Sequence, residues 1–172
     1  MSITLPGPYS SPVVPYHSAI SRYSYGQFCC TTTQSGSANT AYSMPFNVID
    51  FQSGINIISG SRITVSQDGF YNLQFSAQLA QTTNGAADIS IWIAKNGTDE
   101  PASNTMLSIE KATGGGKLVA AWNYGMQLNS GQYVELKWSS TSTHTHLAYI
   151  GTQTSPTRPS TPSVIATLIQ IA

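Results

Sequence analysis

Apolar and polar side chains alternate with a period of two over long parts of this chain. Hydrophobic residues occupy every second position from Tyr71 to Leu79, and polar residues fill the positions between them. The same alternation resumes at Ile89 and continues to Ile93. Because successive side chains of a β-strand point to opposite faces, this pattern predicts two half-buried strands. We expect these two strands to lie together in one wall of a β core.

Further short apolar segments follow the same pattern and are separated by turns rich in Gly, Pro and Asn. Asn96-Gly97 is the strongest hairpin signal, because both residue types accept the positive φ of a tight hairpin turn. Pro45 indicates an edge strand, since proline lacks a backbone donor. The apolar segment that ends the sequence predicts a strand in the middle of a sheet. About ten strands at this spacing are typical of a β-sandwich or barrel. The sequence therefore predicts a single all-β domain over residues 23–172.

Residues 1–22 have a different pattern, in which prolines are separated by small polar residues. Each proline fixes its own φ and drives the preceding residue towards extended geometry, so this segment predicts an extended arm. A disordered tail is the alternative. We expect the arm to lie on a neighbouring subunit. The residues expected to make that contact are Leu5, Pro6, Tyr9, Pro12, Val13, Pro15 and Tyr16.

Charge is scarce along the chain. Only 8% of the 172 residues are charged, and seven basic residues cancel seven acidic ones. This balance argues against nucleic acid or an anionic membrane as a partner. A net charge near zero favours a subunit of a large assembly over a soluble monomer. No basic start precedes an apolar core at the N-terminus, and no apolar run approaches the roughly 18 residues of a membrane span. We expect synthesis in a reducing cytoplasm.

Candidate chemistry is sparse. Neighbouring Cys29 and Cys30 would need a strained disulfide, so two buried or half-buried thiols are expected. Asp99 and Glu100 share a hairpin loop, where solvation is the expected state. No nucleophile, base and orienting group occur together in a known catalytic motif. We therefore expect no enzyme activity, no catalytic residue and no cofactor.

His144 and His146 are the one pair of potential metal ligands that the sequence singles out. In an extended segment both imidazoles project to one side, and three copies around an axis could offer six nitrogens to a transition metal. Two exposed histidines are the alternative, and we favour it because a single His-x-His in a Ser/Thr-rich loop is a weak signal. No metal site is predicted.

One stretch resembles a known family. Residues 69–75 read Gly-Phe-Tyr-Asn-Leu-Gln-Phe and resemble the Gly-x-Tyr-x-Phe-x-Phe strand of the complement and tumour-necrosis-factor superfamily of jelly rolls, with Leu73 at a usual Phe position. The Lys-Asn-Gly turn at 95–97 and the Leu-x-x-Gly-x-Tyr-Val-x-Leu segment at 128–136 are similar to the same family. The phrases AAWN and VELKWSS resemble jelly-roll structural proteins of bacteriophages, particularly those of cyanobacterial or marine hosts. The resemblance implies a jelly-roll β-sandwich.

The resemblance also implies a homotrimer, with three jelly rolls packed side by side around an axis. A sandwich that buries one face of each sheet leaves Phe70 and Trp92 on outward faces, where a partner best explains an apolar patch. Gln74 and Gln78 would be the polar members of that interface, because amides can be buried without a charge penalty. The alternative is that loops of the same chain cover Trp92.

The function that follows from this resemblance is a virion structural protein. We expect a homotrimeric capsid cement or decoration protein on the outer surface of the head, which clamps neighbouring major capsid subunits through residues 1–22. The alternative is a receptor-binding knob or short tail-fibre tip that recognises a host surface glycan, because neutral loops rich in Ser, Thr, Asn, Tyr and Trp also suit sugars. A secreted lectin-like or signalling jelly roll is a third possibility, which the missing signal sequence disfavours.

Overall fold

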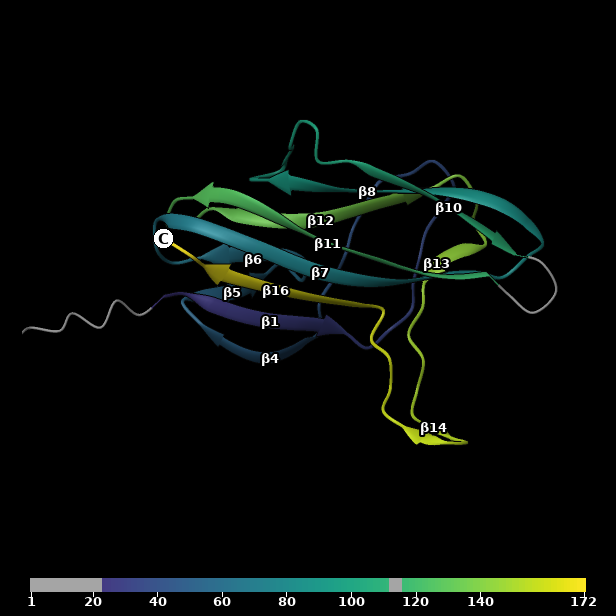
Figure 1. The fold of residues 1–172 in the computed structure, drawn as a ribbon. Coiled ribbons are helices and arrows are strands. Elements are labelled where there is room, and N and C mark those ends of the chain that lie inside the picture. Colours follow the sequence, from purple (N-terminus) through teal and green to yellow (C-terminus); the bar gives the residue numbers. More distant parts are fainter. Residues whose placement is uncertain (1–22, 112–115) are drawn as a thin grey trace, which may run out of the picture.

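A computed structural model describes residues 23–111 and 116–172 of the chain. This part of the chain forms two antiparallel β-sheets packed face to face (Figure 1). The residues predicted for the capsid-contacting arm lie outside the described residues, so that prediction stays open. Within the described ranges the structure contains no helix that could cross a membrane.

The first sheet is built around β7 and is called the β7 sheet. Its strands run in the order β2-β13-β7-β16-β1-β4, and β11 pairs with β7 along its full length on the opposite side. The β7 sheet contains β1 (Tyr25–Cys30), β2 (Gln34–Ser35), β4 (Val48–Ser53), β7 (Gly69–Gln81), β11 (Gly116–Leu128), β13 (Thr145–Leu147) and β16 (Val164–Gln170).

The second sheet is called the β8 sheet. Its strands run in the order β10-β8-β12-β6-β5, with β9 paired to β8 and β3 paired to β12. The β8 sheet contains β3 (Tyr42–Ser43), β5 (Ile55–Ile58), β6 (Arg62–Val65), β8 (Gly85–Lys95), β9 (Thr98–Asp99), β10 (Thr105–Lys111) and β12 (Tyr133–Ser140). A separate hairpin of β14 (Gln153–Thr154) and β15 (Thr157–Arg158) projects from the sandwich (Figure 1).

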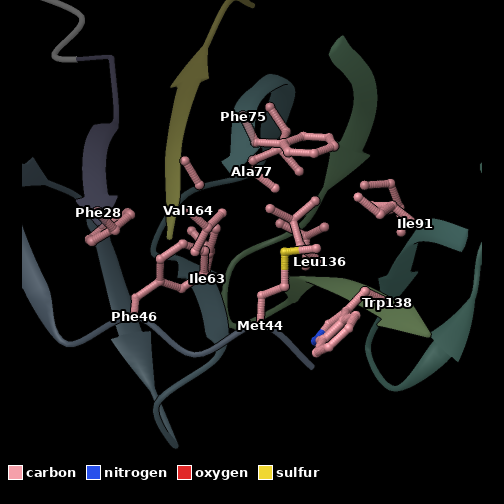
Figure 2. Packing of buried hydrophobic residues seen from close by; sticks show 14 of the residues in the cluster. Phe28, Met44, Phe46, Ile63, Phe75, Ala77, Ile91, Leu136, Trp138 and Val164 are labelled. Atoms are coloured by element: carbon pink, nitrogen blue, oxygen red, sulfur yellow. The ribbon is translucent and has the colours of Figure 1, made fainter. Parts of the chain in front are cut away.

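The core fills the space between the two sheets. The alternating apolar side chains of β7 from Tyr71 to Leu79 are buried, and so are Ile89, Ile91 and Ile93 of β8. Each buried Leu, Ile or Phe side chain of this set stabilises the fold by about 1.5–3 kcal/mol relative to full exposure. Side chains from both sheets meet in this core (Figure 2), and those labelled there are Phe28, Met44, Phe46, Ile63, Phe75, Ala77, Ile91, Leu136, Trp138 and Val164.

Several predictions of local structure are confirmed. The domain is an all-β jelly-roll sandwich of antiparallel strands. Asn96 and Gly97 have φ values of 51° and 83° and join β8 to β9 in a tight hairpin. Strand β4, which follows Pro45, ends the β7 sheet, and the closing strand β16 lies between β7 and β1. The local structure of these segments therefore follows from side-chain alternation, from the φ values that turn residues accept and from the missing N–H of proline.

One prediction was wrong. The alternating segments that form β7 and β8 do not share a wall, because β7 lies in one sheet and β8 in the other. Residues 82–84 between them carry the chain across the sandwich. Alternation records only which side of a strand faces the core, and two strands that face one another across a core carry the same pattern as two paired neighbours. The outward faces of β7 and β8 are therefore on opposite sides of the molecule.

Candidate functional sites

The outer face of the β7 sheet carries a transverse row of uncharged polar side chains. Gln27 of β1 pairs in register with Thr167 of β16, which pairs with Gln74 of β7, and Gln74 pairs with Asn123 of β11. The Thr167 hydroxyl donates to Gln27 Oε1 at 3.2 Å. The Gln27 amide nitrogen donates to Asp50 Oδ2 at 2.9 Å. We call Gln27, Thr167, Gln74 and Asn123 the amide row.

Exposed apolar side chains lie next to the amide row, where β7 begins and β16 ends. Tyr25 and Ile169 are paired in register, and the Ile171 N–H donates to the carbonyl of Phe70 at 2.7 Å. The rings of Tyr25 and Phe51 contact each other with centroids 6.1 Å apart. Between 39% and 59% of each of these five side chains is exposed. We call Tyr25, Phe51, Phe70, Ile169 and Ile171 the apolar patch.

A hollow of about 240 Å³ lies at the far end of the same face. Gln78 of β7, Val119 of β11, and Ala148 and Ile150 from the segment after β13 line it. Apolar atoms dominate this lining, so the hollow is suited to an apolar side chain.

The sandwich is open along the edge where β10 and β11 meet. Strand β10 is an edge strand of the β8 sheet, and β11 is an edge strand of the β7 sheet. The two strands do not pair with one another in the described structure. Leu107, Trp122 and Tyr124 face the core from this edge and are half-buried. Trp122 packs edge-on against Phe75, with ring centroids 4.6 Å apart. The open edge therefore exposes aromatic surface that the chain itself covers only in part.

The predicted interface residues divide between the two sides of the molecule. Phe70 is 51% exposed and belongs to the apolar patch, Gln74 is exposed in the amide row, and Gln78 is half-buried in the hollow at the far end. Trp92 lies in β8 and faces outward from the opposite sheet. The four residues do not form one continuous surface, for the same reason that β7 and β8 do not share a wall.

Trp92 lines a separate hollow of about 390 Å³ on the outer face of the β8 sheet. The ring lies under the Lys137 ammonium, which is 5.7 Å from the ring centroid and 3.5 Å from Asp99 Oδ1. We call this site the Trp92 hollow. Its lining consists of Ser90, Trp92, Asp99, Glu100, Ala102, Asn104 and Ser139.

The rim of the Trp92 hollow is fixed by one buried serine. The Ser103 hydroxyl accepts from the Ile93 N–H at 3.1 Å and donates to the Glu100 carbonyl at 2.8 Å. The Glu100 N–H donates to the Ile93 carbonyl at 2.9 Å. These bonds attach the segment between β9 and β10 to β8. Sequence reasoning assigned Asp99 and Glu100 to a solvated loop and missed the hollow, because nothing local to Ser103 indicates that its hydroxyl reaches β8.

Both cysteines are free and buried, as predicted. Burial, with smaller contributions from the negative charge of Asp50 and from Cys30, raises the pKa of the Cys29 thiol. Burial also acts to raise the pKa of Cys30, but hydrogen bonds with Thr32 and Ser163 outweigh it and the pKa is lowered overall. The pKa values of the two neighbouring thiols are therefore shifted in opposite directions, that of Cys29 by burial and that of Cys30 by hydrogen bonds.

The two histidines do not form the symmetric pair that an extended segment would give. Strand β13 begins at Thr145, so His146 lies in the strand and is half-buried, whereas His144 lies before it and is exposed. Buried Thr145 and Leu147 on either side place His146 on the outer face of the β7 sheet, in register with Ala80. Across residues 23–111 and 116–172 no group of three or more His, Cys, Asp or Glu side chains could hold a metal ion.

Comparison with known proteins supports the fold. No family model matches the chain, and no curated protein matches it. A crystal structure of murine APRIL at pH 8.5 superposes with a TM-score of 0.53 at 11% identity, and one at pH 5.0 with a TM-score of 0.53 at 9% identity. Each comparison covers 87% of this chain and 100% of the other. The described domain is thus a jelly roll of the tumour-necrosis-factor type. At this identity the likeness concerns the fold alone.

Proposed function

We propose that this chain is a structural subunit that assembles with two further copies of itself, and that the trimer is a virion decoration protein on the outer surface of a capsid. One observation carries the self-association: the outer face of the β7 sheet combines an apolar patch with a row of uncharged amides. The capsid role rests on the sequence resemblance and on the low charge of the chain.

The chemistry of the β7 sheet face supports burial. Covering the apolar patch stabilises an assembly by about 25 cal/mol for each Å² of apolar surface removed from water. Apart from Gln27, which bonds to the Asp50 carboxylate, the amide row can exchange water for hydrogen bonds to a partner without the large cost of desolvating a charge. Its internal bonds, such as that between Thr167 and Gln27, already satisfy part of the hydrogen-bonding capacity.

A ring of three subunits requires two different surfaces on each copy, because the contact is head to tail. We assign the outer face of the β7 sheet to one surface and the open edge to the other. The half-buried rings of Trp122 and Tyr124 would pack onto the β7 sheet of the neighbour, completing a core that the single chain leaves partly open. A stable interface of standard size buries about 800 Å² on each partner, which is compatible with two such surfaces.

Sedimentation velocity of the full chain tests the self-association. Ile169 of the apolar patch and Ile58 of β5 are both exposed isoleucines, 39% and 49% exposed respectively, so Ile169→Asp and Ile58→Asp form a matched pair. We expect wild type and Ile58→Asp to sediment as trimers and Ile169→Asp as a monomer. Circular dichroism must show that both variants are folded. A wild-type monomer at micromolar concentration, or a trimer that tolerates Ile169→Asp, contradicts the proposal.

The capsid role needs its own test. Removing residues 2–20 should leave the trimer intact and abolish binding to assembled major capsid protein, if these residues form the clamp. Undiminished binding by the truncated protein contradicts that assignment. Copy number separates the two sequence-based alternatives, because a decoration protein covers the whole head and a tail-fibre tip occurs only at the tail. Quantitative mass spectrometry of purified particles measures this number.

A further inference from the structure

The Trp92 hollow lies on the side of the sandwich opposite the proposed interface. The hollow has a volume of about 390 Å³, and one aromatic ring and several hydrogen-bonding groups line it. Ser90 and Ser139 contribute hydroxyls, Asn104 an amide, and Asp99 and Glu100 carboxylates. An aromatic surface beside convergent polar groups is the usual composition of a small-molecule site.

These groups match the two kinds of surface that a pyranose presents. The ring carbons of a sugar carry C–H bonds that pack on an aromatic face, while its hydroxyls need acceptors and donors in fixed directions. Carboxylates are acceptors only, so Asp99 and Glu100 can each receive bonds from two neighbouring hydroxyls, and such charge-assisted bonds are stronger than neutral ones. A purely apolar ligand would desolvate both carboxylates and leave Glu100 without a partner, since Asp99 alone is paired with Lys137.

The charged groups of the Trp92 hollow determine which class of sugar it favours. Lys137 forms an ion pair with Asp99 and covers the Trp92 ring, so its charge is already engaged within the site. Glu100 has no ion-pair partner among the described residues. The hollow therefore carries a net negative charge at neutral pH, which disfavours carboxylated saccharides such as sialic or uronic acids.

Two further features indicate a binding site. The rim is held by the buried Ser103, so less order has to be gained when a ligand binds. The Trp92 indole nitrogen is buried and has no hydrogen-bond partner in the described structure. Buried indole N–H groups usually find an acceptor. The indole N–H of Trp92 is therefore a donor that the described part of the chain does not use.

We propose that the Trp92 hollow binds a neutral pyranose, which replaces the Lys137 ammonium on the face of Trp92, with Asp99, Glu100 and Asn104 as hydroxyl partners. This site is independent of self-association and goes beyond the proposed structural function. Because it lies on the sheet that the proposed trimer leaves open, each subunit of a trimer would present one copy.

Nuclear magnetic resonance of the full chain tests the proposal directly. The chain contains three tryptophans, so an ¹H–¹⁵N spectrum has three indole signals, and the signal that Trp92→Leu removes belongs to Trp92. The probes are the methyl glycosides of galactose, glucose, mannose and N-acetylglucosamine, together with N-acetylneuraminic acid as the anionic probe. We expect at least one neutral glycoside at millimolar concentration to shift the Trp92 indole signal, with saturation transfer strongest at its ring C–H protons.

Variants separate the roles of the groups. Glu100→Gln and Asp99→Asn should weaken binding by about tenfold each, and Trp92→Leu should weaken it beyond detection, whereas Trp92→Phe should retain part of it. Glu110→Gln is the matched control, because Glu110 is exposed on β10 and pairs with Ala86 at the other end of β8.

Three outcomes would overturn the proposal: no shift with any neutral glycoside, unchanged affinity in Trp92→Leu, or tighter binding of N-acetylneuraminic acid than of every neutral probe. Each variant is checked for folding by circular dichroism, and Trp92→Phe keeps the test valid if Trp92→Leu does not fold.

Discussion

The two outer faces of the sandwich are built from strands with the same alternation, but they expose different chemistry. In the β7 sheet, the charged residues of the strands are Asp50 and Lys117. In the β8 sheet, those with described side chains are Arg62, Asp88, Lys95, Asp99, Glu110, Glu135 and Lys137, of which Glu135 is buried. In a chain with so few charges, this division separates a face suited to burial from one suited to water.

Several charges of the β8 sheet are also locally partnered. The Arg62 guanidinium lies 4.6 Å from the centroid of the Tyr133 ring, and Lys137 pairs with Asp99 at 3.5 Å. Exposed pairs of this kind contribute little stability, roughly 0–1 kcal/mol each, but they keep the surface hydrated. The comparison supports our proposal that one layer of strands carries assembly and that the other remains in contact with solvent and small ligands.

A charge placed in the amide row should have the largest effect, because it opposes self-association through the β7 sheet face. In Gln74→Lys, self-association would bury an unpaired ammonium, which costs roughly 3–5 kcal/mol and weakens assembly by a factor on the order of a hundred or more. Met106→Lys is the control, because Met106 is exposed and faces outward from the β8 sheet. Sedimentation equilibrium measures both. Equal association constants for the two variants would show that the β7 sheet face is not the interface.

Removing the hydroxyl of Ser103 tests the role assigned to the outer face of the β8 sheet. Ser103→Ala deletes a buried hydroxyl that bonds to Ile93 and Glu100, and should lower the free energy of unfolding by about 1–3 kcal/mol. Urea denaturation measures this loss. Because the rim carries Glu100 and Asn104, glycoside affinity should fall as well, while the trimer should persist. A variant that loses the trimer and keeps its glycoside affinity would reverse the assignment of the two faces.

The smallest effect concerns the paired thiols of the β7 sheet. In Cys30→Ser, Cys29 is the only remaining thiol, and its pKa lies above the ordinary value of 9.0 in the folded state. This thiol therefore stabilises the fold below pH 9.0, and that contribution is lost as the pH rises through the raised pKa. In Cys29→Ser, Cys30 is the only remaining thiol, and its pKa lies below 9.0. Its contribution is present above pH 9.0 and is lost as the pH falls through the lowered pKa.

The difference in unfolding free energy between these two variants should therefore change with pH on both sides of 9.0. Background titration of the tyrosines is common to both variants and cancels in that difference. Urea denaturation over a pH series is the measurement. A difference that stays constant with pH would contradict the opposite environments of the two thiols.

The sequence predicts the inside and outside of individual strands well, because alternation follows directly from strand geometry. Tyr71, Leu73 and Ile91 are buried where the pattern places them, and the turn at Asn96-Gly97 follows from the φ that these residues accept. These features depend on a few neighbouring residues, so a single sequence contains the information.

The pairing of strands and the composition of each site depend on contacts distant in sequence. Alternation does not reveal that β7 and β8 belong to opposite sheets, and Trp92 was therefore grouped with Phe70 although the two face opposite sides. The Trp92 hollow requires residues from β8, β12 and the segment after β9. Its rim depends on Ser103, whose role is visible only once its partners are placed.

Hydroxyl-radical footprinting at low and high protein concentration tests the central claim most directly, because it reports on both faces in one sample. We expect Phe70 and Ile169 to become protected as the concentration rises and Trp92 to remain equally reactive at both concentrations. Protection of Trp92 with unchanged reactivity of Phe70 and Ile169 would contradict the assignment of the β7 sheet face to self-association.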